Sequence, residues 1–308
     1  MELLKNTNFD FISKHRTGFV FSAVIIAIGL VFLVIHQGPN FGIDFRGGVQ
    51  IQAKFDRAVT EAELQAKLTE VGYERAKIQV DASKNEAFVS MGHRPEFQRQ
   101  GTSVGRILTD ALLEGGDGWQ ALAGGVNISE VLPSVGRDLK LAALWSVLGA
   151  IAILLMYISW RFEFRFAIGA IAALVHDVVI TLGVFAVLSR EINLPTVAAF
   201  LTIIGYSLND TIVVFDRIRE NSQTLRGTDY ITVLNRSINQ SLSRTVITSL
   251  TTLFVVLIIF LITGSGEEIN TFALALIVGI LVGTYSSVFI ASPILYLWNR
   301  GRPQPTEA

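Results

Sequence analysis

Two aspartates within long apolar segments are the residues whose positions most directly indicate chemistry. Asp177 lies within the apolar run 166–188, and Asp210 lies within the run 194–214. A charged side chain at the centre of a bilayer costs roughly 2.5–3.5 kcal/mol on insertion scales, and such residues usually face a bundle interior and mark ion or proton paths. The alternative is that each is a buried hydrogen-bonding acid that fixes helix packing.

The next apolar run, 245–263, offers a partner for Asp210. Its polar side chains recur at helical spacing on one stripe, formed by Ser241, Thr245, Thr248 and Thr252. Arg244 enters this run from the side of Asp216, and Asp210 lies six residues, about 9 Å of helix rise, before Asp216. We expect Asp210 and Arg244 to pair, so that a proton on Asp210 releases the arginine. The alternative is that Arg244 is an ordinary flanking residue that extends to the membrane surface.

Helical neighbours place both aspartates away from lipid. Asp177 shares a face with Gly169, Ala173 and Thr181, and small residues on one face are typical of a helix–helix interface. Asp210 shares a face with Ile203, Ser207 and Val214. His176, next to Asp177, either relays protons or is a buried structural histidine. Asp177 is therefore the second candidate for proton coupling, with a weaker claim than Asp210.

The composition excludes several other kinds of site. The 308 residues are 51% hydrophobic and 17% charged, which is below the quarter or so typical of soluble proteins. A formal net charge of −1 gives no global basic field, so no nucleic-acid partner is expected. The absence of cysteine excludes thiolate metal sites, and the four histidines show no ligand-like spacing. We expect no metal and no cofactor.

Six apolar runs of about membrane-spanning length position these residues, at 18–35, 139–159, 166–188, 194–214, 245–263 and 269–297. The predicted divisions are an N-terminal segment 1–17, a first span 18–36, an outer domain 37–138, a five-helix bundle 139–297 with a loop 215–244, and a tail 298–308. The first run is too long for the apolar core of a cleaved signal peptide. No internal repeat is visible, so this half of a transporter-like protein is expected to seek a partner half.

The flanking charges predict the orientation. Twelve lysines and arginines lie on the side of the N-terminus: Lys5, Lys14, Arg16, Arg161, Arg165, Arg217, Arg219, Arg226, Arg236, Arg244, Arg300 and Arg302. The opposite short loops carry only Arg190. Because short cytoplasmic flanks are rich in lysine and arginine, both termini and the loop 215–244 are expected to be cytoplasmic, and the segment 37–138 to be extracytoplasmic.

The outer segment has the pattern of a small α+β domain. Alternation predicts strands, and helical periodicity predicts helices, in the order strand 49–55, helix 60–71, strands 77–81 and 87–91, helix 102–113 and strand 126–131. Thr60 and Glu63 have the spacing of a capping box at the first helix. The order βαββαβ predicts a ferredoxin-like domain.

A glycine-rich segment, Gly-Ile-Asp-Phe-Arg-Gly-Gly at 42–48, follows the first span. The simplest interpretation is a turn that leads into a strand, with glycines at positive φ. It is not a phosphate-binding loop, because the Gly-Lys-Ser/Thr ending and the following helix are missing.

Two motifs carry a family resemblance. The segment 42–48 and the polar fourth-span segment 205–221 are similar to signatures of the SecD/SecF family of protein-export membrane proteins, and a single outer domain of about 100 residues favours its SecF branch. The signature residues are Gly42, Asp44, Phe45, Gly47, Gly48, Gly205, Asn209, Asp216 and Arg217. The resemblance also places the chain with the resistance-nodulation-division transporters.

The resemblance implies a function and partners. It implies a subunit of the bacterial inner membrane that works with SecD, near the SecYEG channel and YajC, and uses proton-motive force to assist late preprotein translocation and membrane insertion. The resemblance also implies that the residues of the family's proton path are Asp210 and Arg244 in this chain. Apart from preproteins, membrane lipid is the expected contact.

Three other functions stay open at this point. A small-molecule exporter half is less favoured because the small outer domain offers no obvious substrate pocket. A structural scaffold of the translocon is the second. An intramembrane aspartyl protease would carry paired aspartates in Tyr-Asp and Gly-x-Gly-Asp contexts, whereas His176 and Asn209 precede the aspartates here. We therefore expect no enzyme activity.

Overall fold

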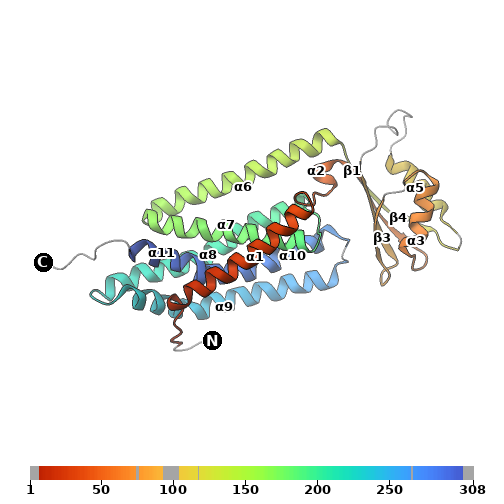
Figure 1. Cartoon of the computed structure of the whole chain (residues 1–308). Helices are drawn as coiled ribbons and strands as arrows, with labels where there is room; N and C mark the ends of the chain where they lie inside the picture. The colour runs from red at the N-terminus through yellow and green to blue at the C-terminus, as the bar shows by residue number, and fades with distance from the viewer. Residues whose placement is uncertain (1–6, 74–75, 93–103, 117, 265, 301–308) are drawn as a thin grey trace.

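The computed structural model describes residues 7–73, 76–92, 104–116, 118–264 and 266–300. Most of the predicted tail 298–308, the first six residues of the segment 1–17, and the first two residues of the predicted helix 102–113 lie outside these ranges. A helical bundle and a small sheet domain lie end to end (Figure 1). The elements in chain order are η1 (Ile12–Lys14), α1 (His15–Ile35), α2 (Ile43–Arg46), β1 (Gly48–Phe55), α3 (Glu61–Glu70), β2 (Lys77–Asp81), β3 (Glu86–Gly92), α5 (Val104–Glu114), β4 (Ala121–Val131), α6 (Pro133–Arg161), α7 (Phe164–Val187), α8 (Leu194–Thr224), α9 (Tyr230–Ile262), α10 (Glu268–Ser286), the π-helical η2 (Ser287–Ala291) and α11 (Ser292–Arg300).

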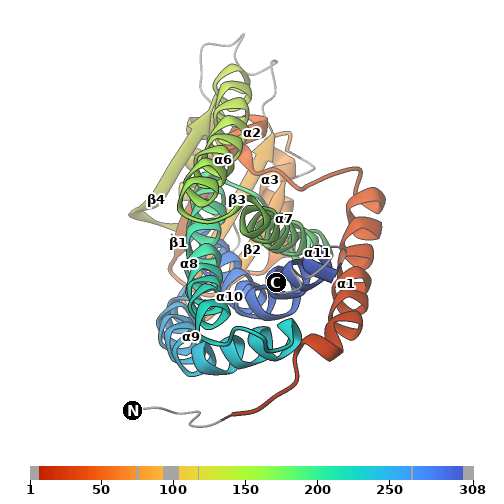
Figure 2. The same cartoon turned by 90° about the vertical axis from the view of Figure 1, so that its left-hand side faces the viewer.

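Six helical segments of the described chain are long and apolar enough to cross a membrane, as the sequence predicts. They are η1 with α1, then α6, α7, α8, α9, and the continuous run of α10, η2 and α11. Viewed along the bundle, α1 and α6 lie on the outside, whereas α10 and α11 lie near the middle (Figure 2). The chain is therefore a multi-pass membrane protein in which α7, α8 and the run of α10, η2 and α11 are the most buried spans.

The ferredoxin-like prediction is confirmed. The sheet order is β2-β3-β1-β4, and every neighbouring pair is antiparallel. Alternate residues of β1, including Val49, Ile51 and Ala53, are buried in one core with α3 and α5. Gln50 and Gln52 lie on the opposite, polar face of the sheet, because neighbouring strand residues point to opposite sides.

The last strand begins earlier than predicted, at Ala121 rather than near residue 126. Ala121 pairs with Phe55 across a register shift in β1. Gly124 has a φ of 83°, so the strand is irregular at the glycine pair 124–125. Because glycine has a low strand propensity, the sequence pattern did not predict the first half of this strand.

The connection between the fourth and fifth spans is much shorter than the predicted loop 215–244. The helix α8 continues to Thr224, α9 begins at Tyr230, and only residues 225–229 join them. Asn221 of α8 donates to Ser237 Oγ at 2.9 Å and to Gln240 Oε1 at 2.8 Å on α9. Polar contacts hold this helical hairpin together past the apolar runs, so hydropathy does not show where the helices end.

The N-terminal segment is fixed to this hairpin by two asparagines of α9. Asn235 Oδ1 accepts from the backbone N–H groups of Phe11 and Ile12 at 3.0 Å each. Asn239 makes a reciprocal pair with Phe9, accepting from its N–H at 2.9 Å and donating to its carbonyl at 2.8 Å. The start of the chain therefore lies against a helix more than 220 residues later.

The capping box predicted at Thr60 and Glu63 is present, and Arg57 reinforces it. The hydrogen bond from Arg57 at 2.6 Å, with bonds from the Thr60 backbone and hydroxyl, lowers the pKa of Glu63 to about 2. Because the folded pKa lies below its ordinary value of 4.5, this contribution to stability is complete above about pH 4.5 and is lost as the pH falls toward 2. We expect carboxyl NMR of the full chain to place the Glu63 midpoint near pH 2, and Arg57→Ala to raise it. A midpoint near 4.5 would contradict this arrangement.

Candidate functional site

Asp177 is the centre of a buried polar network rather than an isolated acid. It is 1% exposed. Its Oδ2 accepts hydrogen bonds from Ser207 on α8 and from Ser286 on α10, the latter at 2.9 Å. Its Oδ1 lies 2.9 Å from Nδ1 of His176. The carboxylate thus joins α7, α8 and α10 at one point, and Ser207 serves Asp177 although the sequence grouped it with Asp210.

His176 extends the network to the first span. Its Nε2 lies 2.9 Å from Ser22 Oγ on α1, and its ring stacks on Tyr285 of α10. The Tyr285 hydroxyl donates to the Gly18 carbonyl at 2.8 Å. Four spans therefore share one hydrogen-bonded cluster, which gives Asp177 and His176 a definite packing role.

Replacing Asp177 by alanine is expected to destabilise the bundle by about 3 kcal/mol, because three buried donors lose their acceptor. An apparent melting temperature lower by about 5–10 °C in detergent would report this loss. Asp177→Asn keeps one acceptor oxygen and is expected to cost less. Glu220→Ala, at an exposed ion pair with Arg217, is the matched control with little effect. A wild-type melting temperature for Asp177→Ala would contradict the network.

Asp210 has a different environment, with few polar partners. It is 3% exposed, and Ser249 of α9 donates to its Oδ2 at 3.4 Å. Ser249 in turn lies 2.7 Å from the hydroxyl oxygen of Thr284 on α10. This weakly bonded acid lies where α8, α9 and α10 meet. A buried carboxyl group with one long hydrogen bond can take up a proton without breaking an extensive network.

Arg244 does not pair directly with Asp210. Among the described residues no acidic side chain lies within 4.0 Å of the Arg244 guanidinium, and the Arg244 side chain is exposed. The structure therefore shows no direct ion pair between Arg244 and Asp210, although the sequence suggested one.

The close approach of α8 and α10 depends on a ridge of small residues on α10 that includes Gly279 and Gly283. A Cβ at Gly279 would lie 2.3 Å from Ile203, and a Cβ at Gly283 would lie 2.9 Å from Ser207. Larger residues there would push α10 away from the helix that carries Asp210. The ridge is helix packing, as its spacing indicates.

The fourth-span signature residues mostly line one face of α8. Gly205, Asn209 and Asp216 are exposed, and no side chain lies within 4 Å of a Cβ built at Gly205. Asp216 accepts from Arg161 at 3.4 Å, and Arg217 donates to Glu220 at 2.9 Å. Asn209 lies in the middle of a membrane span, so this face is not suited to contact lipid.

The glycine-rich segment 42–48 is more than a turn. Gly47 has a φ of 75°, and a Cβ there would lie 2.7 Å from the backbone of Pro133 at the start of α6. Gly48 has a φ of 155°, and a Cβ there would lie 2.2 Å from the carbonyl oxygen of Met91 on β3. The two glycines let the chain pass between α6 and the sheet, and sequence reasoning missed this close contact.

The acidic residue of the same segment caps another helix. Asp44 Oδ2 accepts from the backbone N–H of Leu194, the first residue of α8, at 2.7 Å. Phe45 is buried in the apolar cluster that contains Phe200 and Ile203. The segment thus contacts α6, α8 and the outer sheet at one place, and the span that it touches is the one that carries Asp210.

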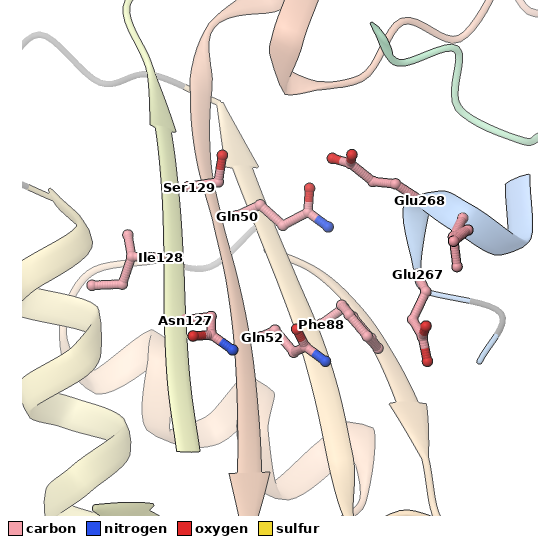
Figure 3. Close-up of a pocket in the computed structure, with 9 residues that line it drawn as sticks. Gln50, Gln52, Phe88, Asn127, Ile128, Ser129, Glu267 and Glu268 are labelled. Atoms are coloured by element: carbon pink, nitrogen blue, oxygen red, sulfur yellow. The ribbon is translucent and has the colours of Figure 1, made fainter. Parts of the chain in front are cut away.

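The remaining contact between the sheet domain and the bundle encloses a cleft of about 320 Å³ (Figure 3). Gln50, Gln52 and Asn127 point from the sheet toward Glu267 and Glu268 near the start of α10. Two ion pairs bridge the two sides, Lys84 to Glu267 at 2.8 Å and Lys77 to Glu191 at 2.7 Å. In the described ranges no three histidine or acidic side chains gather as metal ligands.

Comparison with known proteins supports the family resemblance. The family model described as "Protein export membrane protein SecD/SecF, C-terminal" matches residues 121–301, and the model "SecD/SecF GG Motif" matches residues 32–59. The chain belongs to the SecD/SecF family. The second match covers the segment that contacts α6, α8 and the sheet, so the family signature coincides with this three-way contact.

Similar SecD/SecF family members extend over nearly the whole chain. The protein translocase subunit SecF of Thermodesulfovibrio yellowstonii is 41% identical over 304 residues, which cover 97% of this chain and 98% of that one. The subunit SecF of Haemophilus influenzae is 40% identical over 287 residues, 93% of this chain and 85% of that one. The predicted membership in the SecF branch is confirmed.

A solved structure has the same fold. The crystal structure of SecDF, a translocon-associated membrane protein from Thermus thermophilus, superimposes with a TM-score of 0.81 at 35% identity. The match covers 97% of this chain and 40% of that one. This SecD/SecF family member therefore spans about two fifths of the SecDF chain.

Proposed function

We propose that this chain acts with SecD as a subunit of the bacterial protein-export machinery, where it uses proton-motive force to assist late preprotein translocation and membrane insertion. The coarser role, a SecF-type protein translocase subunit, follows from its relatives. The more specific role, proton-driven assistance of export, is supported by the buried, weakly bonded Asp210 beside an exposed polar face of α8.

The polar face of α8 supports a membrane partner. Thr202, Gly205, Asn209 and Asp216 recur along one side of the helix and are exposed in the single chain. Polar side chains in a span normally face another helix, and small residues permit close packing. A SecD helix packed there would cover Asn209 and bring a second protein surface next to the level of Asp210. SecYEG and YajC are the further proposed partners, with no nucleic acid.

Asp210 and Arg244 are proposed as the proton-coupling pair. One elementary charge crossing 100 mV releases about 2.3 kcal/mol, which is enough to bias two orientations that differ by a few kcal/mol. A proton on Asp210 would remove the attraction on Arg244 and change the packing of α8 against α9. Asp177 is a weaker candidate, because its three hydrogen bonds to other helices and to His176 give it a structural role.

The proposed orientation has both termini in the cytoplasm of an inner-membrane protein and the sheet domain outside. The bundle end that faces the sheet carries the acidic residues Asp44, Glu191, Glu267 and Glu268. The opposite end holds the arginine-rich flanks, and the usual excess of lysine and arginine in cytoplasmic flanks supports this orientation.

The function is tested by depleting the chain from cells and measuring preprotein export in membrane vesicles with and without proton-motive force. The expected result is loss of the force-dependent part of export, restored by the wild-type chain. Unchanged force dependence with loss of SecD assembly would instead indicate a scaffold. Unchanged export with raised accumulation of small toxic compounds would indicate a small-molecule exporter half.

A further inference from the structure

The segment 40–44, between the first span and the outer sheet, is bonded to the start of α8 by backbone and side-chain hydrogen bonds. Ile192 N–H donates to the Asn40 carbonyl at 2.7 Å, and Gly42 N–H donates to the Ile192 carbonyl at 2.8 Å. Asp44 adds the bond from Leu194 N–H at 2.7 Å. A carboxylate at a helix N-terminus also has a favourable interaction with the helix dipole. The start of α8 is therefore attached to this segment over three residues.

Residues 44–48, which continue this segment, pack closely against the start of α6 and lead directly into β1. Gly136 of α6 approaches the segment so closely that a Cβ there would lie 3.1 Å from the Asp44 carbonyl oxygen. Gly47 contacts Pro133, and Gly48 begins β1, whose neighbour is β3. A displacement of Asp44 must therefore displace β1 or the start of α6.

Away from residue 44, the sheet domain meets the bundle at the turn before α10, where a Cβ at Gly266 would lie 2.3 Å from Phe88, and across two ion pairs. The cleft of about 320 Å³ separates the polar face of the sheet from the start of α10 (Figure 3). The ion pairs that cross this boundary, Lys84 with Glu267 and Lys77 with Glu191, have side chains 24–44% exposed. Exposed ion pairs contribute little stability and rearrange easily. The attachment near residue 44 is the contact at which the start of α8 is hydrogen-bonded to the segment that enters the sheet.

Asp210 lies on the same helix as this attachment. It is sixteen residues after Leu194, about 24 Å along α8, and the helix is continuous between them. If Asp210 tilts or shifts α8, the movement extends to Leu194, because a continuous hydrogen-bonded helix moves largely as one body. There the movement acts on the hydrogen bond between Leu194 N–H and the Asp44 carboxylate.

We propose that Asp44 is a positioning residue that joins α8 to the outer domain, so that movement of α8 at Asp210 turns the domain about the segment 42–48. This inference rests on the proposed proton-coupling function of Asp210 and adds the residue that transmits its effect. Asp44 itself carries no proton in this scheme and touches no substrate.

The test measures the domain orientation in the full-length complex with SecD in lipid nanodiscs. The chain has no native cysteine, so spin labels at Asp110→Cys on α5 and Leu188→Cys after α7 report one distance. We expect Asp210→Asn, which imitates the protonated state, to shift this distance. When Asp44→Ala is combined with Asp210→Asn, the shift in this distance should be absent. When Asp44→Asn is used instead, the shift should return, because the asparagine carbonyl oxygen still accepts from Leu194 N–H. A full shift with Asp44→Ala would overturn the proposal.

Hydrogen exchange at Leu194 provides an independent measurement. Loss of its acceptor in Asp44→Ala is expected to speed exchange of this amide about tenfold, the factor for one hydrogen bond of ordinary net strength. Glu61→Ala, an exposed acid at the start of α3, is the control with no change. Unchanged exchange at Leu194 in Asp44→Ala would also overturn the proposal.

Failure of the Asp44 transmission and failure of the proton-coupling function give different results. If Asp210→Asn abolishes force-dependent export but leaves the distance unchanged, the proton-coupling function stands and the Asp44 transmission is wrong. If Asp210→Asn leaves both force-dependent export and the distance unchanged, the proton-coupling function fails and the transmission fails with it.

Discussion

Asp210→Asn is expected to remove the force-dependent part of preprotein export while the complex with SecD still assembles. The amide has the shape of the carboxyl group and keeps an oxygen that accepts from Ser249, but it cannot take up or release a proton. One charge across 100 mV is worth about 2.3 kcal/mol, a bias of roughly fifty-fold between two states, so the force-dependent rate should fall at least about tenfold. Export in vesicles with and without proton-motive force measures this effect.

The matched control is Glu163→Gln at the start of α7. The Glu163 side chain is 69% exposed and lies 2.9 Å from Arg165, a pair of little energetic value at a surface. We expect its force dependence to stay near that of the wild type. If Asp210→Asn assembles with SecD and exports with normal force dependence, the proton path does not pass through Asp210.

Gly48→Ala is expected to destabilise the chain by about 3 kcal/mol or more. The added Cβ would lie 2.2 Å from the Met91 carbonyl oxygen, so β1 and β3 would have to separate, and the φ of 155° is itself strained for alanine. The expected readout is a lower melting temperature of the full chain in detergent. Faster proteolysis of the outer domain should accompany it.

The control for this prediction is the residue that pairs with Gly48. Gly92 is its register partner on β3, but nothing lies within 4 Å of a Cβ built there. Gly92→Ala should therefore leave the melting temperature nearly unchanged. Equal melting temperatures for Gly48→Ala and Gly92→Ala would show that the contact with Met91 is not tight.

The outer domain could be predicted from sequence because its signals are local. Thr60 and Glu63 are three residues apart, and their capping box depends only on that spacing. The end of the fourth span could not be predicted in the same way. Asn221 and Ser237 stabilise a helical hairpin by a contact across sixteen residues, and hydropathy does not register such a polar contact.

The candidate site was predictable in its residue types and not in its pairings. A carboxylate within an apolar run must be buried wherever it lies, and both Asp177 and Asp210 are. Which hydroxyl reaches which acid depends on how helices cross: Ser207, one turn before Asp210, bonds to Asp177 on α7 instead. The role of Asp44 was hidden because Leu194 is 150 residues away.

The two asparagines of α9 that hold the start of the chain have a consequence for synthesis. Phe9 and Phe11 are synthesised before the first span, but their acceptors, Asn239 and Asn235, are made more than 220 residues later. At 5–20 residues per second the wait lasts roughly 10–45 seconds. During that time the amide groups before the first span must be solvated by water or the membrane surface. The nascent chain therefore closes on itself only when its fifth span is inserted, and a chain that stops earlier leaves its own beginning unanchored.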